Sequence, residues 1–206
     1  MNDIGLSRKE REKLRHKGEI LSVALKLFSD KGFYNVSMNE IAEESEFSVG
    51  TLYKFFDSKE SLFSALIGSC AKRVFDILIP ILDEKVGEKQ KVVNYIKAHR
   101  QIIEENEPSI RLYLSQNVPS ASTLRPDVDS ETNAVREAIQ QRLSDIFESG
   151  MHKGVFKDFD PWMMTLSLSA ILEGFVFSVI KSPGKILIDD GLSGIEELFF
   201  EGIVKS

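Results

Sequence analysis

Two serine residues in the first quarter of the chain each begin a short helical pattern. Ser37 is followed three residues later by Glu40, the spacing of a capping box, in which each residue's side chain accepts a hydrogen bond from the other's backbone N–H. Ser48 is a second N-cap, and Val49, Leu52 and Phe55 then recur at helical spacing. Helices over 37–46 and 48–56 are too short to be stable alone, so flanking helices must hold them.

Only a tight turn fits between these two helices. Ala42 is small enough for the second helix to cross close to it, and Ile41 and Leu52 are apolar residues that can fix the angle between the helices. Two helices of this size and separation form a helix-turn-helix, whose second helix enters the major groove of DNA. The spacing therefore predicts a DNA-binding module.

The rest of the chain also follows a helical period, so the predicted fold class is all-α. Pro108 and Pro119 are interpreted as helix stops, Gly87 as a break, and residues 120–129 as a loop. We expect an N-terminal three-helix DNA-binding domain over 1–60 and a larger helical domain over 61–206. The predicted helices are 11–30, 37–46, 48–56, 57–82, 89–106, 109–116, 129–153, 161–181 and 191–204.

The net charge of −6 is unusual for a nucleic-acid binder. Residues 8–17, however, hold six basic and two acidic residues, a concentrated arm that can meet a phosphate backbone. The single cysteine, Cys70, excludes an intrachain disulfide. No signal peptide and no uninterrupted apolar run of membrane-spanning length is apparent, so a cytoplasmic protein without membrane partners is expected.

Four segments of the N-terminal part, taken in order, are similar to the DNA-binding domain of the TetR family of repressors. They are 27–33 (LFSDKGF), 37–42 (SMNEIA), 48–56 (SVGTLYKFF) and 58–62 (SKESL). The resemblance implies a homodimeric transcriptional regulator, released from a palindromic operator by a small molecule that binds the second domain. Glu46 departs from the pattern, because the turn commonly has glycine, and a left-handed residue with a side chain costs about 1–2 kcal/mol.

Chemistry and resemblance together assign roles in DNA binding. Val49, Gly50 and Thr51 occupy the first turn of the recognition helix, the part nearest to base edges. Tyr53 and Lys59 resemble family residues that contact phosphate. The full predicted set is Arg8, Arg11, Arg15, Ser37, Ser48, Val49, Gly50, Thr51, Tyr53, Lys54 and Lys59. Alternatives remain: the serines can be helix caps alone, Tyr53 can be a core residue, and the arm can be a solvated helix end.

In the second domain, the helix over 161–181 is apolar almost all round, and Ala170, Gly174 and Ser178 form a stripe of small residues. Such a stripe lets another helix approach closely, and the resemblance implies that this helix lies in the dimer interface; packing within one chain is the alternative. Predicted effector-binding residues are His99, Ile103, Tyr113, Gln116, Phe147, Met151, Glu173 and Phe177. Each can equally be a core residue, and Glu173 can face an effector, the dimer partner or solvent.

Other functions have weaker support. Asp145, Glu148 and His152 share a helix face, but no second ligand set accompanies them, so neither a metal nor a cofactor is expected. The sequence has no glycine-rich loop of the kind that binds phosphate in nucleotide-dependent enzymes, so this motif gives no indication of an enzyme. The predicted partners are double-stranded DNA, a second copy of the chain, and an apolar or amphipathic effector such as a drug, a dye or a fatty acyl compound. The alternative hypotheses are a helical DNA-binding protein without an effector and, with less support, an enzyme.

Overall fold

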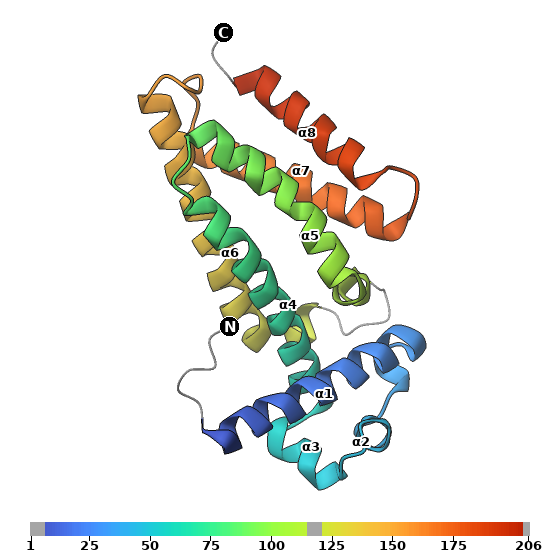
Figure 1. Cartoon of the computed structure of the whole chain (residues 1–206). Coiled ribbons are helices and arrows are strands. Elements are labelled where there is room, and N and C mark those ends of the chain that lie inside the picture. Colours follow the sequence, from blue (N-terminus) through green and yellow to red (C-terminus); the bar gives the residue numbers. More distant parts are fainter. Residues whose placement is uncertain (1–6, 115–120, 204–206) are drawn as a thin grey trace. The chain divides into compact units, whose positions relative to one another are not determined.

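The computed structural model describes the backbone of residues 7–114 and 121–203, and the side chains of these ranges except 113–132 and 202–203. The described part consists of helices (Figure 1), which confirms the all-α prediction. The elements are α1 (Arg8–Lys31), the 3-10 helix η1 (Phe33–Asn35), α2 (Met38–Glu44), α3 (Val49–Phe55), α4 (Lys59–Leu82), α5 (Glu88–Leu114), α6 (Ala121–His152), α7 (Pro161–Lys181) and α8 (Ile188–Ile203).

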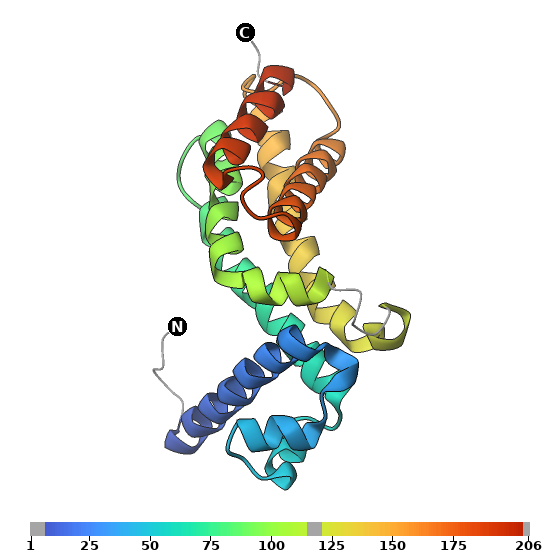
Figure 2. The same ribbon diagram turned by 90° about the vertical axis from the view of Figure 1, so that its right-hand side faces the viewer.

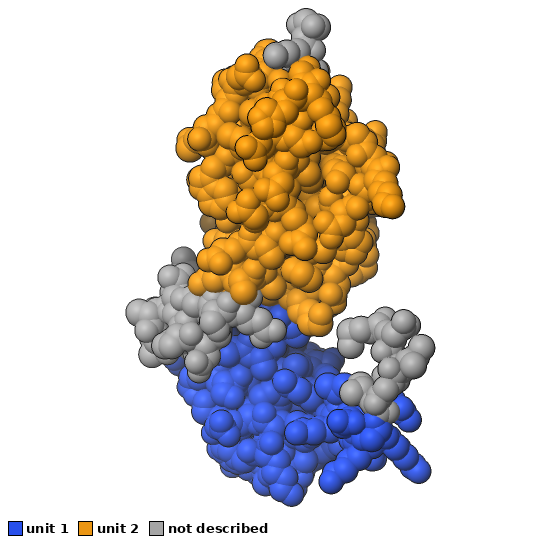
Figure 3. Space-filling model, turned by 90° about the vertical axis from the view of Figure 1, so that its left-hand side faces the viewer, with its two compact units in different colours: residues 1–69, 112–128 blue, residues 70–111, 129–206 orange. Residues whose placement is uncertain are grey.

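The chain divides into two compact units, coloured in Figure 3. Unit 1 comprises residues 1–69 and 112–128, and unit 2 comprises residues 70–111 and 129–206. The division falls inside α4, after Ser69. The predicted domain boundary at residue 60 stays a prediction, and the two units are described separately below.

Side-chain caps begin several of the helices where the sequence predicts them. The hydroxyl of Ser37 accepts a hydrogen bond from the Glu40 N–H, and that of Ser48 accepts one from the Thr51 N–H. Asp160 caps α7 with Pro161 in its first turn. α1 begins earlier than predicted because Ser7 and Glu10 form a complete capping box.

Two predicted breaks are wrong. Pro108 lies inside α5, which continues to Leu114 and bends toward its end (Figure 2), the usual effect of a proline ring on a helix. The helix continues because packing holds both sides of the proline: Asn106 and Ser109 are buried and accept hydrogen bonds from Arg73 of α4 at 2.8 and 3.3 Å. Residues 121–129, predicted as part of a loop, belong to α6. A proline removes one backbone hydrogen bond, whereas the other residues of the segment each gain one by remaining helical.

The core of unit 1 joins all four of its N-terminal helices. Ile20 of α1, Ile41 of α2, Leu52 of α3 and Leu62 of α4 are completely inaccessible to solvent. Phe33 of η1 closes the cluster, with ring centroids 5.2 Å from Phe28 and 5.3 Å from Phe63. The short helices α2 and α3 are therefore held by the two long helices that flank them.

The core of unit 2 is built around α7. Leu168, Leu172 and Phe175 of this helix are buried, and α7 packs against α8. By length and composition alone α7 is apolar enough to cross a membrane, with a mean hydropathy of 1.8, but 44% of that window is buried inside the protein. Burial of one face accounts for part of its apolar character. The opposite face exposes apolar side chains, among them Met163, Leu166 and Phe177.

One buried polar group in unit 2 makes stability depend on pH. His99 is 8% exposed, its Nδ1 lies 2.9 Å from the Tyr95 carbonyl, and its ring packs edge-on against that of Tyr95. Burial disfavours the charged imidazolium and lowers the pKa of His99 from 6.5 to about 4.

We therefore expect the folded chain to lose stability on mild acidification. The unfolded chain binds a proton near pH 6.5 that the folded chain excludes until about pH 4, so stability present at neutral pH is lost as the pH falls through this window. Between pH 7 and pH 5 the loss is about 2 kcal/mol. Urea denaturation at several pH values, compared with His99→Gln, measures it. Equal pH dependence in both proteins would contradict this assignment.

Candidate nucleic-acid interface

The turn between α2 and α3 uses a left-handed residue that is not glycine. Glu46 has a φ of 59°, and among the described residues no other non-glycine residue has a positive φ. The Phe47 N–H bonds the Ala42 carbonyl at 2.9 Å and the Glu46 N–H bonds that of Glu43 at 3.1 Å, so the end of α2 is tightly closed. The structure thus confirms that Glu46 occupies the position where a glycine would be less strained.

The recognition helix α3 is anchored on one face and open on the other. Leu52 is fully buried and Val49 is half-buried against the core, whereas Tyr53 is 49% exposed and Lys54 is exposed. A Cβ added to Gly50 would meet only the Ser48 hydroxyl, at 4.0 Å. Packing within the chain therefore does not require glycine there, whereas close approach of an external partner would.

Beside α3 lies an open hollow of about 570 Å³. The N-termini of α2 and α4 border it, and the Ser58 hydroxyl accepts a hydrogen bond from the Ser61 N–H at 3.1 Å. Its lining residues are Tyr34, Asn35, Val36, Ser37, Met38, Asn39, Tyr53, Asp57, Ser58, Lys59 and Glu60. Positive helix ends, hydroxyl groups and an ammonium group are chemically suited to a phosphate.

Tyr34, which the sequence analysis did not single out, is 64% exposed at this hollow. The only indication in the sequence that Tyr34 would be exposed is its position next to Phe33, because of two adjacent aromatic residues usually only one enters the core. The hollow thus brings together predicted Ser37, Tyr53 and Lys59 with the unpredicted Tyr34.

Lys59 has a structural role that the sequence did not reveal. Its Nζ donates hydrogen bonds to the carbonyls of Phe33 and Val36, both at 2.8 Å, and lies 4.4 Å from the centroid of the Phe33 ring. Lys59 thereby ties the start of α4 to the segment before α2. An ammonium group has three N–H donors, so one donor remains beyond these two carbonyls.

The basic arm forms the first turns of α1 and is exposed at Arg8, Arg11 and Arg15. Arg15 forms an ion pair with Glu19 at 2.8 Å on the outer surface. On another side of the helix, the His16 ring lies 5.0 Å from that of Phe47, and Lys17 Nζ lies 5.8 Å from the centroid of the Phe56 ring. The arm is thus docked against residues at both ends of α3.

The predicted effector residues of unit 2 have different surroundings. His99, Ile103 and Phe147 are buried and Met151 is half-buried, whereas Glu173 and Phe177 are exposed on α7. The side chains of Tyr113 and Gln116 lie outside the described residues. Ala170, Gly174 and Ser178, predicted for the dimer interface, lie on the same helix as Phe177, and all three are exposed.

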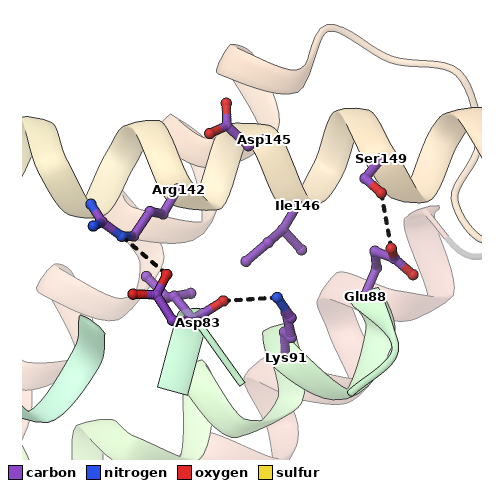
Figure 4. A pocket seen from close by; sticks show the side chains of 8 residues that line it. Asp83, Glu88, Lys91, Arg142, Asp145, Ile146 and Ser149 are labelled. Carbon is purple, nitrogen blue, oxygen red and sulfur yellow. Dashed lines mark hydrogen bonds and ion pairs between the residues drawn. The ribbon is translucent and has the colours of Figure 1, made fainter. Parts of the chain in front are cut away.

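A second, smaller hollow of about 230 Å³ in unit 2 has a polar wall (Figure 4). Arg142 bonds Asp83 at 3.2 Å, Lys91 bonds the Leu82 carbonyl at 2.9 Å, and Ser149 bonds Glu88 at 2.9 Å. The nearby Lys153 also pairs with Glu88 and, as the largest cause, lowers the pKa of that carboxyl to about 2. These contacts fasten the turn between α4 and α5 to α6. Within the described side chains, no three metal-ligating groups gather at Asp145, Glu148 and His152 or elsewhere.

Comparison with known proteins agrees with this geometry. Residues 20–66, from α1 to α4, match the family model described as bacterial regulatory proteins, tetR family. The uncharacterized HTH-type transcriptional regulator YuxN of Bacillus subtilis is 38% identical over 73 residues, covering 35% of this chain and 23% of YuxN. The HTH-type transcriptional repressor AcnR of Corynebacterium glutamicum is 24% identical over 191 residues, covering 91% of both proteins.

The fold is shared beyond the N-terminal helices. The crystal structure of the TetR family transcriptional regulator PfmR from Thermus thermophilus has a TM-score of 0.72 and 23% identity, covering 88% of this chain and 97% of PfmR. The match spans less than two thirds of the length of the first curated relatives, 23% of YuxN and 58% of the activator FasR of Mycolicibacterium smegmatis.

α2 and α3 are two short helices joined by a tight turn, with their inner faces in the core and the outer face of α3 exposed. This arrangement defines a helix-turn-helix. Residues 20–66, which hold this helix pair, are similar to the DNA-binding part of the tetR family of bacterial regulatory proteins. The family model and the curated relatives named here are described as transcriptional regulators.

The strained turn yields a prediction on stability. Glu46→Gly should stabilise the chain by about 1 kcal/mol, because glycine adopts a positive φ without the steric cost of a Cβ. Glu44→Gly, which removes the same charge from the helical end of α2, should destabilise it by about 1 kcal/mol. Urea denaturation measures both changes, and a loss of stability in Glu46→Gly would show that the glutamate side chain stabilises the turn.

Proposed function

We propose that this chain is a homodimeric transcriptional repressor, which binds a palindromic operator through α3 and releases it when a small apolar or amphipathic effector binds to unit 2. The observation that carries the proposal is that α3 has one face buried in the core and the opposite face exposed. Leu52 is fully buried, whereas Gly50, Tyr53 and Lys54 are exposed beside the hollow at the N-termini of α2 and α4. A helix anchored on one face and open on the other can enter a groove without unfolding its support.

Base edges and phosphates would be contacted by different parts of this surface. Val49, Gly50 and Thr51 on the first turn of α3 are placed for base edges, with Ser48 capping that turn. Ser37, Tyr53 and Lys59 at the hollow are suited to phosphate, and Lys54 on the open side of α3 adds a positive charge. The positive end of the dipole of α4, a helix of 24 residues, favours an anion at the same place.

A homodimer is supported by the outer face of α7. Leu166, Ile171 and Phe177 are 36–39% exposed, and the small residues Gly174 and Ser178 lie exposed among them. α8 adds Leu198, which is 68% exposed. Apolar and small side chains gathered on one helix face are suited to burial against an identical face. One recognition helix contacts few base pairs, and two on a palindrome increase both affinity and specificity.

The effector proposal depends on the interior of unit 2. Ile103, Phe147 and Met151 offer apolar surroundings, and His99 offers a neutral imidazole that can bond a polar group of the ligand. The exposure of Phe177 and Glu173 favours the dimer face for these two residues. We place the switch in α4, because its first part belongs to unit 1 and its last part to unit 2. A shift of α4 would change the spacing between the two recognition helices, and a few kcal/mol of preference is sufficient.

The repressor sense of regulation is supported by the name of AcnR, which matches over most of both chains. A helical DNA-binding protein without an effector is the alternative. That alternative is favoured if no small apolar or amphipathic compound that binds unit 2 changes the affinity for the operator.

The DNA-binding surface predicts two kinds of variant. Tyr53→Phe removes one exposed hydroxyl and should weaken binding to all duplexes severalfold, whereas Thr51→Ala should change which base is preferred, by about 1–3 kcal/mol at one position. Tyr95→Phe is the matched control, because the Tyr95 hydroxyl is buried in unit 2. Fluorescence anisotropy with selected operator and mixed-sequence duplexes measures these effects. Unchanged binding in both Tyr53→Phe and Thr51→Ala would refute the assignment of α3.

The dimer face predicts a separate outcome. A side chain at Gly174 meets nothing within 4 Å inside the chain, so Gly174→Glu should fold normally but place a charge in the interface. Light scattering should show the mass of a single chain for this variant and of two chains for wild type. Gly87→Glu, the same change in an open position between α4 and α5, should remain dimeric. A dimeric Gly174→Glu would place the interface elsewhere.

A further inference from the structure

The basic arm of α1 has two faces with different charge patterns. Arg8, Arg11 and Arg15 lie on the face that continues through Glu19, Ser22 and Lys26, a face turned mostly to solvent. Lys9, Lys13 and Lys17 lie four residues apart on a face that continues through Ile20, Ala24 and Phe28, all of them buried. The lysine face is therefore the extension, past the edge of the core, of the side of α1 that packs on α2 and α3.

Contacts within unit 1 confirm which way this face points. Lys17 lies over the ring of Phe56, the residue that ends α3, and His16 packs against Phe47, which precedes the cap of α3. α1 thus crosses α3 at residues 16 and 17, and its first turns extend beyond α3 (Figures 1 and 2). Lys9 and Lys13 follow on that same side, about 6 Å apart along the helix axis.

The electrostatic surroundings of the two faces also differ. The arginine face carries its own acids, Glu12 and Glu19, and Arg15 is already paired with Glu19. The lysine face carries one acid, Glu10, whose carboxylate accepts a hydrogen bond from the Ser7 N–H in the capping box. Among the described residues, Lys9 and Lys13 form no ion pair, so their ammonium groups are available to an external anion.

We propose that Lys9 and Lys13 bind the DNA phosphate backbone flanking the segment contacted by α3, and that the arginine face does not contact it. Two positive charges on the side of α1 that faces α3, past the edge of the core, are complementary to the backbone of a duplex that lies against α3. This inference rests on the proposed DNA binding. It narrows the predicted arm contacts, which included Arg8, Arg11 and Arg15, and it concerns residues that precede the family match at residue 20.

The test compares two double variants of the full chain that each remove two positive charges. Lys9→Gln/Lys13→Gln changes the lysine face and Arg8→Gln/Arg15→Gln the arginine face. Fluorescence anisotropy with a labelled mixed-sequence duplex, from about 50 to about 200 mM KCl, gives the slope of log affinity against log salt. Losing two phosphate contacts should reduce the magnitude of this slope by about 1.8 per bound protomer, or about 3.6 for the proposed homodimer. Over this salt range the affinity of the lysine variant should therefore fall about twelvefold less per protomer, and about 150-fold less per dimer, than that of wild type.

The arginine variant should keep a slope within about 0.5 of wild type. Lys9→Arg/Lys13→Arg should also have the slope of wild type, because arginine binds phosphate as lysine does. Thermal unfolding followed by circular dichroism verifies that each variant is folded. Equal slope reductions in both glutamine variants would show a general field effect and overturn the inference, as would an unchanged slope in both. Absence of salt-dependent binding by the wild type would instead overturn the proposed DNA binding itself.

Discussion

Burial of a few large apolar side chains in unit 1 is the interaction on which the DNA-binding surface depends. α2 and α3 have seven residues each, too few to form stable helices in water. Ile41 and Leu52 hold them to the core, between Ile20 of α1 and Leu62 of α4. Because the inner face of each short helix packs in this core, its outer face is not needed for packing within the chain. The exposed Gly50, Tyr53 and Lys54 are a consequence of that division.

The same core explains why the surface is rigid enough for recognition. Lys59 bonds two carbonyls before α2 and lies over the Phe33 ring, so the start of α4 and the start of α2 are fixed relative to each other within unit 1. The strained Glu46 turn persists because the helices on both sides of it are anchored. Preformed geometry of this kind reduces the conformational entropy lost when a partner is bound.

Local signals in the sequence predicted most of this arrangement. Ser37, Ser48 and Asp160 act as caps because capping depends only on residues within one turn of the chain. The prediction that Pro108 ends a helix was wrong because buried contacts between α5 and α4 keep the chain helical on both sides of the proline. These contacts join residues more than thirty positions apart, which local sequence signals do not report. The double role of Lys59 and the exposure of Phe177 likewise depend on long-range packing, which periodicity within one helix does not specify.

Deciding which basic residues of α1 point toward α3 requires both the sequence and the packed structure. The sequence identified six basic residues in the arm, but it could not say which of them point toward α3. Burial of Ile20 and Ala24, together with the contacts of His16 and Lys17, fixes the rotation of α1 about its own axis, and with it the direction of every side chain on the arm. A helix keeps this direction over its whole length. The core therefore determines, at a distance of two turns, which charges of an otherwise acidic protein lie on the side of its recognition helix.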